Sequence, residues 1–243
     1  MRERSKLARM LLRLVRPVWR VRRLALLSEL LFWDRWLARR FSDPSGAARL
    51  RDEALVPESL WRFVEHARAD PVKILEVGAG PFASIGSGHP TRRVEVTATD
   101  VLADKYNRIL RRRGITPKVP TIYADAERLS QQFGPAAFDL VYAANCIDHT
   151  DDALRAIQEM VSVVRPGGYI VMDHFQDEGA HQDYAGLHKW NLKAADGKLL
   201  LWNLEQRHDV SRILAGSCDV EVSSAGSDLH VEIRKREIPP AAR

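Results

Sequence analysis

The stretch "ILEVGAGPFASIG", residues 74–86, decides the fold class of this chain. Its first residues are mostly apolar, as in a buried strand, and Gly78 and Gly80 then mark a tight turn. We expect a helix to start directly after the turn. A strand, a glycine turn and a helix form the first unit of a doubly wound α/β sheet, which predicts a ligand site at the carboxyl end of the strand.

Strand and helix patterns alternate downstream of this turn. Such alternation predicts βαβ units and therefore a parallel sheet. Residues 218–237 instead hold two strand patterns around an Ala-Gly-Ser-Asp turn, and so tight a hairpin makes the last strand antiparallel. We predict an α/β, doubly wound, Rossmann-like sheet with an antiparallel last strand. Its parallel strands are expected within residues 72–77, 93–100, 119–125, 138–145 and 165–175, with helices at 151–164 and 204–216.

The net charge of +5 is distributed unevenly along the 243 residues. Residues 1–40 hold 12 Lys and Arg against 3 Asp and Glu, whereas the rest of the chain holds 25 against 29. An acidic main body argues against a nucleic-acid groove. The apolar run at 24–33 is interrupted by Ser28 and Glu29, and it is shorter than the about 18 residues that a membrane span needs. With two cysteines and no secretory signal, we expect a cytoplasmic protein.

The basic N-terminus predicts two helices, separated at Pro17 within residues 1–42, with an apolar stripe on one face. Such a segment suits an anionic membrane surface, a lid over the active site or a subunit interface. An apolar stripe usually packs on the protein's own core or on a dimer partner, and we expect a homo-oligomer. We divide the chain into an N-terminal helical extension, 1–70, and a main domain, 71–243. The stripe consists of Leu26, Leu30, Trp33 and Leu37.

Taken alone, the glycine turn fits the dinucleotide-binding pattern G-x-G-x-x-G/A, with Ala83 in its last position and Asp100 lying 20 residues after Gly80. Three features oppose a nicotinamide or flavin cofactor. Pro81 removes an N–H group from the turn, and the antiparallel last strand departs from the usual dinucleotide sheet. Glu76 places a carboxylate at the strand end, which suits a cationic or amino-bearing ligand better than a phosphate.

Over residues 72–236 the sequence resembles the class I S-adenosylmethionine-dependent methyltransferases. The resemblance rests on "LEVGAGP", on Asp100 at the end of the second strand, on "YADAERL" and on "FDLVYAANCIDHTDDALRAIQEMVSVVRPGGYIVMDHF". The last block is the most specific, because it matches the passage from the fourth to the fifth strand of this family. Phe82 stands where the family usually has a third glycine. This departure affects the expected shape of the loop more than the identity of the cofactor. The resemblance implies S-adenosylmethionine as cofactor and methyl transfer as activity.

The resemblance also implies roles for residues at the strand ends. Glu76, Gly78 and Gly80 would line the methionine end of the cofactor. Asp100 would bind the ribose hydroxyls, since a carboxylate can accept both, and Asp125 would bind the adenine amine. Missing side chains at the glycines would let the cofactor approach the backbone. The other members of the expected cofactor-binding set are Ala79, Pro81, Ala126, Asn145 and Cys146.

Candidate bases follow the fourth and fifth strands, where the sites of open α/β sheets lie. A hydroxyl acceptor loses a proton during methyl transfer, and His149 is the first candidate for the base because it directly follows the fourth strand. Asp148 or Asp151 could orient its ring. The alternative for His149 is a packing or cofactor-contact residue. The catalytic candidates are therefore His149, Asp148 and, from the segment described next, His188.

The segment at 186–202 predicts a hairpin with its turn at Asp196 and Gly197. Aromatic faces beside hydrogen-bonding groups suit a sugar or another polyhydroxylated ring. We therefore expect O-methylation of a small-molecule or saccharide acceptor. The alternative is that the two Trp residues of the segment are core or dimer contacts. The side chains that would form the acceptor platform are His188, Trp190 and Trp202.

A divalent cation, which would lower the pKa of an acceptor hydroxyl, is left open. Three histidines recur every seven residues among several acids, but no two have the i,i+4 spacing of a helical metal site. Three other functions also stay open: a non-catalytic methyltransferase-like subunit that binds a partner, an N- or C-methyltransferase, and a nicotinamide oxidoreductase. The residues of the candidate metal cluster are His174, His181 and His188, with Asp173, Asp177, Glu178 and Asp183.

Overall fold

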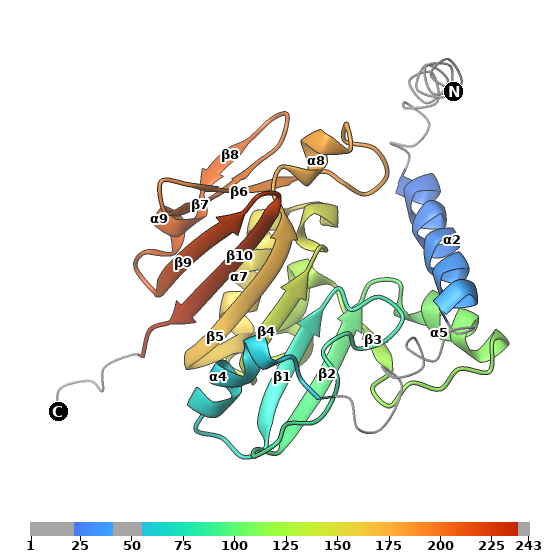
Figure 1. Ribbon diagram of the computed structural model, residues 1–243. Helices are drawn as coiled ribbons and strands as arrows, with labels where there is room; N and C mark the ends of the chain where they lie inside the picture. The colour runs from blue at the N-terminus through green and yellow to red at the C-terminus, as the bar shows by residue number, and fades with distance from the viewer. Residues whose placement is uncertain (1–21, 41–54, 238–243) are drawn as a thin grey trace.

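The computed structural model describes residues 22–40 and 55–237. A seven-stranded sheet forms its centre, with the strand order β3-β2-β1-β4-β5-β10-β9 (Figure 1). Neighbouring strands are parallel except at β10, which is antiparallel to both β5 and β9. The predicted Rossmann-like sheet with an antiparallel last strand is therefore confirmed. The strands are β1 (Val72–Val77), β2 (Val94–Asp100), β3 (Thr121–Tyr123), β4 (Phe138–Ala144), β5 (Val164–Phe175), β9 (Cys218–Ala225) and β10 (Asp228–Lys235).

The carboxyl ends of four parallel strands meet at one edge of the sheet. Val77 at the end of β1 pairs with Thr99 of β2 on one side and with Ala143 of β4 on the other. Asp100 at the end of β2 pairs with Tyr123 at the end of β3. The loops that follow these strands therefore lie together, where an open α/β sheet binds its ligands.

Helices cover both faces of the sheet (Figure 1). Alternate residues of β1 point to opposite faces: Leu75 packs in a core cluster with Ile157 of α7, whereas Ile74 packs in a second cluster with Leu60 of α4. Full burial of such an aliphatic side chain stabilises the fold by about 1.5–3 kcal/mol. The helices around the sheet are α4 (Glu58–His66), α5 (Ala103–Arg112), η1 (Ala126–Arg128), α6 (Leu129–Phe133), η2 (Ile147–His149) and α7 (Ala153–Val163).

The expected helix after the glycine turn does not form. Residues 78–93 are all described, and they contain only turns, bends and isolated bridges between β1 and β2. Pro81 and Pro90 each lack the N–H group that a helix would use. Gly78 and Gly80 have positive φ angles of 68° and 69°, which are not helical. The strand and the turn are confirmed, but the predicted helix start is wrong.

An insertion between β5 and β9 carries a second, three-stranded sheet in the order β6-β7-β8. The β6–β7 hairpin turns at Asp196 and Gly197, whose φ angles are 51° and 71°, so the predicted hairpin is confirmed. The predicted helix at 204–216 is shorter than expected, because its first part pairs with β7 as a strand. The elements of the insertion are α8 (Glu178–His181), β6 (Asn191–Ala195), β7 (Lys198–Trp202), β8 (Arg207–Asp209) and α9 (Val210–Leu214).

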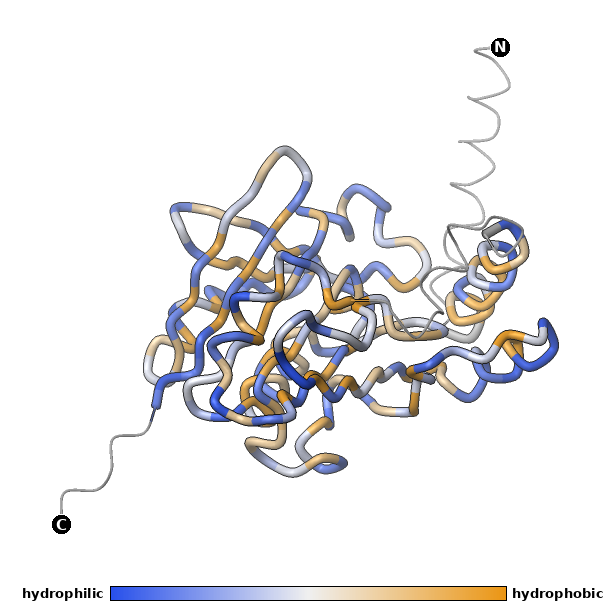
Figure 2. The backbone as a smooth tube through the Cα atoms, turned by 60° about the horizontal axis from the view of Figure 1, so that its bottom comes forward, coloured by the Kyte–Doolittle hydropathy of each residue, from blue (hydrophilic) through white to orange (hydrophobic). Residues whose placement is uncertain are grey.

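Helix α2 (Arg22–Arg40) packs on its own chain through the predicted apolar stripe. Leu37 is fully buried in a cluster with Phe82 of the glycine loop and with Ile109 and Leu110 of α5. Figure 2 shows hydrophobic and hydrophilic segments alternating along α2. The helix expected before Pro17 lies outside the described residues. No helix in the described ranges is both long enough and apolar enough to cross a membrane.

Candidate cofactor and active site

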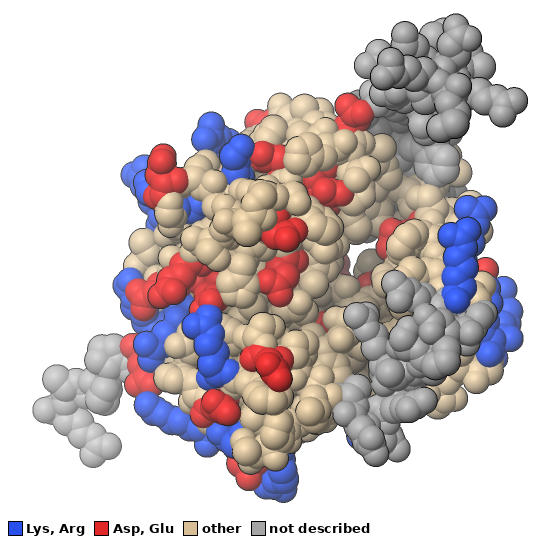
Figure 3. Space-filling model, in the orientation of Figure 1, with Lys and Arg blue, Asp and Glu red and all other residues tan. Residues whose placement is uncertain are grey.

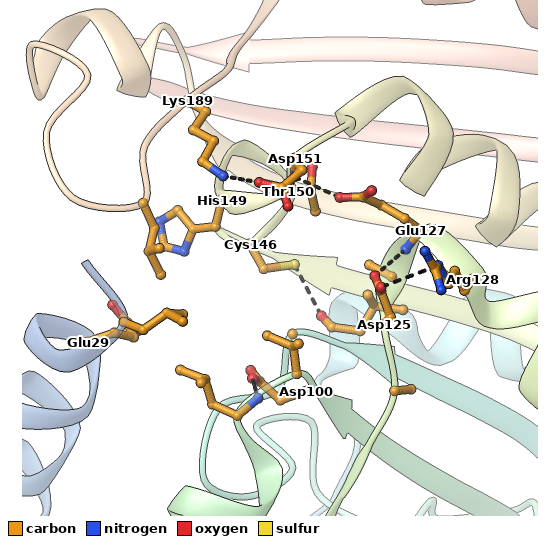
Figure 4. A pocket seen from close by; sticks show the side chains of 18 of the residues that line it. Glu29, Asp100, Asp125, Glu127, Arg128, Cys146, His149, Thr150, Asp151 and Lys189 are labelled. Carbon is orange, nitrogen blue, oxygen red and sulfur yellow. Dashed lines mark hydrogen bonds and ion pairs between the residues drawn. The ribbon is translucent and has the colours of Figure 1, made fainter. Parts of the chain in front are cut away.

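A cavity of about 250 Å³ lies at the carboxyl ends of the strands. Its lining comes from the ends of β1 and β2, from the loops after β3 and β4, from residues 187 and 189 of the insertion and from α2. Figure 3 shows the hollow beside α2, with Asp and Glu side chains near its rim. Figure 4 shows side chains from these separate elements pointing into the same space. The cavity therefore occupies the site that the strand ends predict.

Asp100 ties the glycine turn to the end of β2. One carboxylate oxygen accepts the N–H of Gly80 at 3.1 Å, and the other accepts the N–H of Leu102 at 2.7 Å. Burial, with a smaller contribution from the charge of Glu29 on α2, raises the pKa of Asp100 to about 6, against the opposing effect of the two backbone hydrogen bonds. Each oxygen keeps acceptor capacity for a ligand hydroxyl.

Asp125 lines the cavity directly after β3. Its side chain caps η1 by accepting the N–H of Glu127 at 3.0 Å, and it lies 3.9 Å from the guanidinium of Arg128. Ala126 lies beside it in the cavity lining. The capping interaction fixes the carboxylate at the cavity wall, where it can accept a hydrogen bond from a ligand amine.

At each of the two turn glycines, another side chain of the protein occupies the space where a Cβ atom would lie. A Cβ atom at Gly78 would lie 2.3 Å from Cβ of Cys146, and one at Gly80 would lie 2.9 Å from a ring carbon of Trp33. Cys146 in turn donates its thiol to the carbonyl of Val77 at 3.2 Å. Gly78 and Cys146 line the cavity, whereas Gly80 supports α2.

The cavity brings together half of the expected cofactor-binding set. The carboxylate of Glu76 is buried and accepts the N–H and the hydroxyl of Ser84, so it shapes the loop after the turn. Asn145 is exposed, and its side chain accepts the N–H of Phe175 at 3.1 Å. The members that line the cavity are Gly78, Asp100, Asp125, Ala126 and Cys146; those that do not are Glu76, Ala79, Gly80, Pro81 and Asn145.

The three catalytic candidates converge on one point. Nδ1 of His188 lies 2.7 Å from Oδ2 of Asp148, and Nε2 of His149 lies 3.2 Å from the same His188 nitrogen and 3.5 Å from the same Asp148 oxygen. His149 lines the cavity, while Asp148 is buried behind it with 3% of its surface exposed. The loop after β4 and the insertion thus supply one cluster, which we call the Asp-His-His cluster.

The protonation of this cluster follows from burial and pairing. Burial lowers the pKa of His149 below its ordinary value, against the opposing charge of Asp148. Burial would also lower the pKa of His188, but its hydrogen bond to Asp148 and the charge of that carboxylate raise it overall. Burial would raise the pKa of Asp148, but the His188 hydrogen bond and the imidazole charges lower it. At neutral pH the cluster therefore holds a neutral His149 beside an ionised Asp148.

The same three residues could hold a divalent cation. Ligand atoms of one such ion lie about 2 Å from it and hence about 3 Å from one another, which the distances of the cluster approach. Within the described ranges, this is the one group of three His, Cys or acidic residues whose ligand atoms all lie within 4.8 Å. The cluster that the sequence left open around His174, His181 and His188 does not come together: His181 is exposed, and His174 is buried with Nε2 unpartnered among the described residues.

The expected acceptor platform does not form either. Trp190 is only 2% exposed and packs in the main hydrophobic core. The indole N–H of Trp202 donates to Asp177 at 3.2 Å on the insertion. The alternative that these residues are structural contacts is confirmed for Trp190. Of the three platform residues, only His188 belongs to the Asp-His-His cluster.

The sequence leaves a lid over the active site open for the N-terminal helices, but it does not identify Glu29 of α2 or Lys189 as cavity residues. Glu29 points from α2 into the cavity, toward the space between Asp100 and His149 (Figure 4). Lys189 lines the cavity from the insertion and forms an ion pair with Asp151. No local motif marks either residue, because each reaches the cavity only through tertiary packing.

The sequence between β1 and β5 matches a known family. Residues 75–172 match the family model described as a methyltransferase domain. This segment holds Asp100, Asp125 and His149. The glycine pattern alone is also compatible with a nicotinamide or flavin enzyme, and the family match favours a methyltransferase.

Curated relatives agree with this match at low identity. The chloroplastic tocopherol O-methyltransferase of Arabidopsis thaliana is 25% identical over 68% of this chain and 50% of the relative. The norajmaline N-methyltransferase of Rauvolfia serpentina is 28% identical over 53% of this chain and 43% of the relative. This chain spans about half the length of the curated relatives it matches.

A solved structure shows the same fold. The CurJ carbon methyltransferase superposes with a TM-score of 0.52 at 15% identity, over 96% of this chain and 71% of that chain. The shared feature is the mostly parallel sheet of seven strands with an antiparallel last strand. Residues 75–172 thus match a methyltransferase domain, and the chain shares the fold of this solved methyltransferase.

Proposed function

We propose that this protein transfers the methyl group of S-adenosylmethionine to a hydroxyl of a small-molecule or saccharide acceptor, with His149 as the base. The observation that carries the proposal is the Asp-His-His cluster, in which a histidine of lowered pKa stands at the cavity wall with an ionised carboxylate behind it. A hydroxyl acceptor needs such a base, whereas a free amine does not.

The cavity residues fit this cofactor by the chemistry of their donors and acceptors. Asp100 keeps acceptor capacity for the ribose hydroxyls, and Asp125 can accept a hydrogen bond from the adenine amine. Gly78 and Cys146 would lie beside the methionine part. When bound, S-adenosylmethionine supplies a methyl group on a positively charged sulfur. The protein then has to align the acceptor and exclude water.

The cluster defines a path for the acceptor proton. Nε2 of His149 lies 3.2 Å from Nδ1 of His188 and 3.5 Å from the carboxylate of Asp148. We assign the proton of the neutral ring to Nε2, where the negative charge of Asp148 favours it, so Nδ1 is left to accept. During methyl transfer the acceptor hydroxyl would lose its proton to Nδ1 of His149, and bound S-adenosylmethionine would supply the methyl carbon and take back the electron pair of its carbon–sulfur bond. Asp148 then stabilises the imidazolium, and His188 acts as a positioning residue.

A screen of acceptors tests this function directly. The purified protein is incubated with S-adenosylmethionine carrying an isotope-labelled methyl group and with hydroxylated acceptors, beginning with sugars. We expect labelled methyl ethers, identified by NMR, and loss of turnover in His149→Gln with cofactor affinity retained. Transfer to amines alone, at a rate insensitive to His149→Gln, would replace O-methylation by N-methylation.

The remaining sequence predictions stay proposals. From the sequence we propose a cytoplasmic location, a homo-oligomeric state and a domain boundary at residue 70. The same applies to contact of the basic N-terminus with an anionic membrane surface, since residues 1–21 lie outside the described ranges.

A further inference from the structure

Helix α2 contributes a carboxylate to a cavity that is otherwise built from the sheet and its insertion. Glu29 lines the cavity and faces the space between Asp100 and His149 (Figure 4). Its charge contributes to the raised pKa of Asp100 and opposes the lowering of the pKa of His149 by burial. Glu29 therefore lies within electrostatic range of both the expected ribose position and the expected base.

The position of Glu29 is held by its own helix. The indole N–H of Trp33, one helical turn later, donates to Oε1 of Glu29 at 2.8 Å. The Trp33 ring packs against Gly80, and the next turn is anchored by the buried Leu37. Glu29 is thus presented to the cavity by a packed element, and no hydrogen bond from a described side chain engages its second carboxylate oxygen.

The charges of the cavity leave a local excess of negative charge at this point. Asp125 lies near Arg128, and Asp151 pairs with Lys189. Glu127 is engaged by backbone N–H groups of the loop after β4. Among the side chains that the structure describes, no Lys or Arg forms an ion pair with Glu29 or Asp100. Two like charges that face one cavity repel each other, and a bound cation relieves that repulsion.

We propose that Glu29 is a cofactor-selective residue: its carboxylate favours the positively charged sulfonium of S-adenosylmethionine over the neutral sulfur of S-adenosylhomocysteine. The two ligands share their adenosine and amino acid parts and differ by one methyl group and one charge. Hydrogen bonds to the shared parts contribute equally to the affinity for both ligands, whereas a nearby carboxylate raises the affinity for the charged ligand alone. S-adenosylmethionine therefore competes better with the product for this site than it would at a site without this charge. This inference rests on the cofactor and is independent of the acceptor.

Binding measurements without any acceptor test the inference. Dissociation constants for S-adenosylmethionine and S-adenosylhomocysteine are measured by calorimetry on the full chain and on Glu29→Gln, whose amide can still accept from Trp33. We expect Glu29→Gln to weaken S-adenosylmethionine binding about five- to tenfold and S-adenosylhomocysteine binding less than twofold. Glu29→Asp keeps the charge and is expected to retain most of the preference.

A control on the same helix separates charge at the cavity from general damage to α2. Asp34→Asn removes a carboxylate that pairs with Arg113 and is not part of the cavity lining, so both dissociation constants should stay unchanged. Equal weakening of both ligands in Glu29→Gln would overturn the inference, because it would mean a contact with a shared part of the cofactor. If both dissociation constants of Glu29→Gln, and therefore their ratio, equal those of the unaltered protein, the inference is overturned as well.

Discussion

The Trp33 ring of α2 covers Gly80 of the glycine turn so closely that a Cβ atom on Gly80 would lie 2.9 Å from its Cζ2 atom. The turn that the sequence predicts to be a ligand loop is therefore also a surface on which helix α2 packs. Gly80 needs to be glycine for two separate reasons: its φ angle is +69°, and the space beyond its Cα is already filled.

These two reasons can be separated by a matched pair of substitutions. Gly114, at the end of α5, has a φ angle of +65° but open space where a Cβ would be. Gly114→Ala should cost about 1 kcal/mol of unfolding free energy from backbone strain alone. Gly80→Ala should cost about 1–3 kcal/mol more, because it also displaces Trp33.

Urea unfolding of both variants, followed by tryptophan fluorescence, gives these free energies. The native-state fluorescence should change in Gly80→Ala and stay unchanged in Gly114→Ala, since only the first substitution touches Trp33. Equal destabilisation of the two variants, with no change in native fluorescence, would show that Trp33 does not pack on the turn in solution.

Asp100 predicts how cofactor affinity depends on pH. Because burial raises its pKa to about 6, the free protein carries a protonated Asp100 below that pH, and this proton must leave before the carboxylate can accept ribose hydroxyls. Binding of S-adenosylhomocysteine should weaken as pH falls below about 6, approaching tenfold per pH unit. Calorimetric titrations between pH 5 and pH 8 measure this.

The variant Asp100→Asn supplies the comparison. It should bind S-adenosylhomocysteine about ten- to a hundredfold more weakly at pH 7.5, as expected for loss of a charged hydrogen-bond acceptor, with little pH dependence left. Unaltered affinity in Asp100→Asn would rule out the ribose role. A weakened but still pH-dependent affinity would assign the titration to another group.

The parts predictable from the sequence are those set by local pattern and strand order. Alternating apolar runs placed the strands, and their ends placed Asp100, Asp125 and His149 at one edge. The helix after the turn was mispredicted, because a strand followed by glycines resembles the usual first unit even when the following residues cannot form a helix. Glu29 could not be found, since its place depends on how α2 packs rather than on any neighbour in sequence.

The same limit explains the Asp-His-His cluster. Asp148 and His188 were separate candidates on distant segments, and only the folded insertion brings their side chains to 2.7 Å. Trp190 looked like part of an acceptor platform because aromatic residues are typical of both sugar sites and cores. Its burial is decided by packing against the main core, which periodicity in one short hairpin does not reveal.

The base role of His149 predicts an acid limb in the activity profile. A pKa lowered by burial keeps the ring neutral at neutral pH, so kcat/KM should be constant above pH 7 and fall only below the ordinary histidine value near 6.5. The charge of His188 contributes to this lowering. His188→Gln should therefore move the acid limb to higher pH, while the amide keeps a hydrogen bond to Asp148.

Initial rates on the acceptor found by the screen, measured from pH 5 to pH 8.5, test both statements. His149→Gln should lose about 100-fold or more in kcat and show no acid limb from this group. His208→Gln is a suitable control, because that half-buried histidine of β8 interacts with Gln206 and lies outside the cavity lining. At saturating S-adenosylmethionine, where protonation of Asp100 does not limit the rate, an acid limb that persists unchanged in His149→Gln would assign the base to another residue.

Metal removal distinguishes the two chemistries open to the Asp-His-His cluster. If His149 is a base, a chelator should leave turnover unchanged, whereas added Zn²⁺ should inhibit, because two imidazoles and a carboxylate suit that ion and would occupy the proton-accepting residue. His188→Gln removes one ligand and should raise the Zn²⁺ concentration for half inhibition about tenfold or more. Loss of turnover on chelation, restored by one divalent cation and not by others, would instead make the cluster a metal site and His149 a ligand of it.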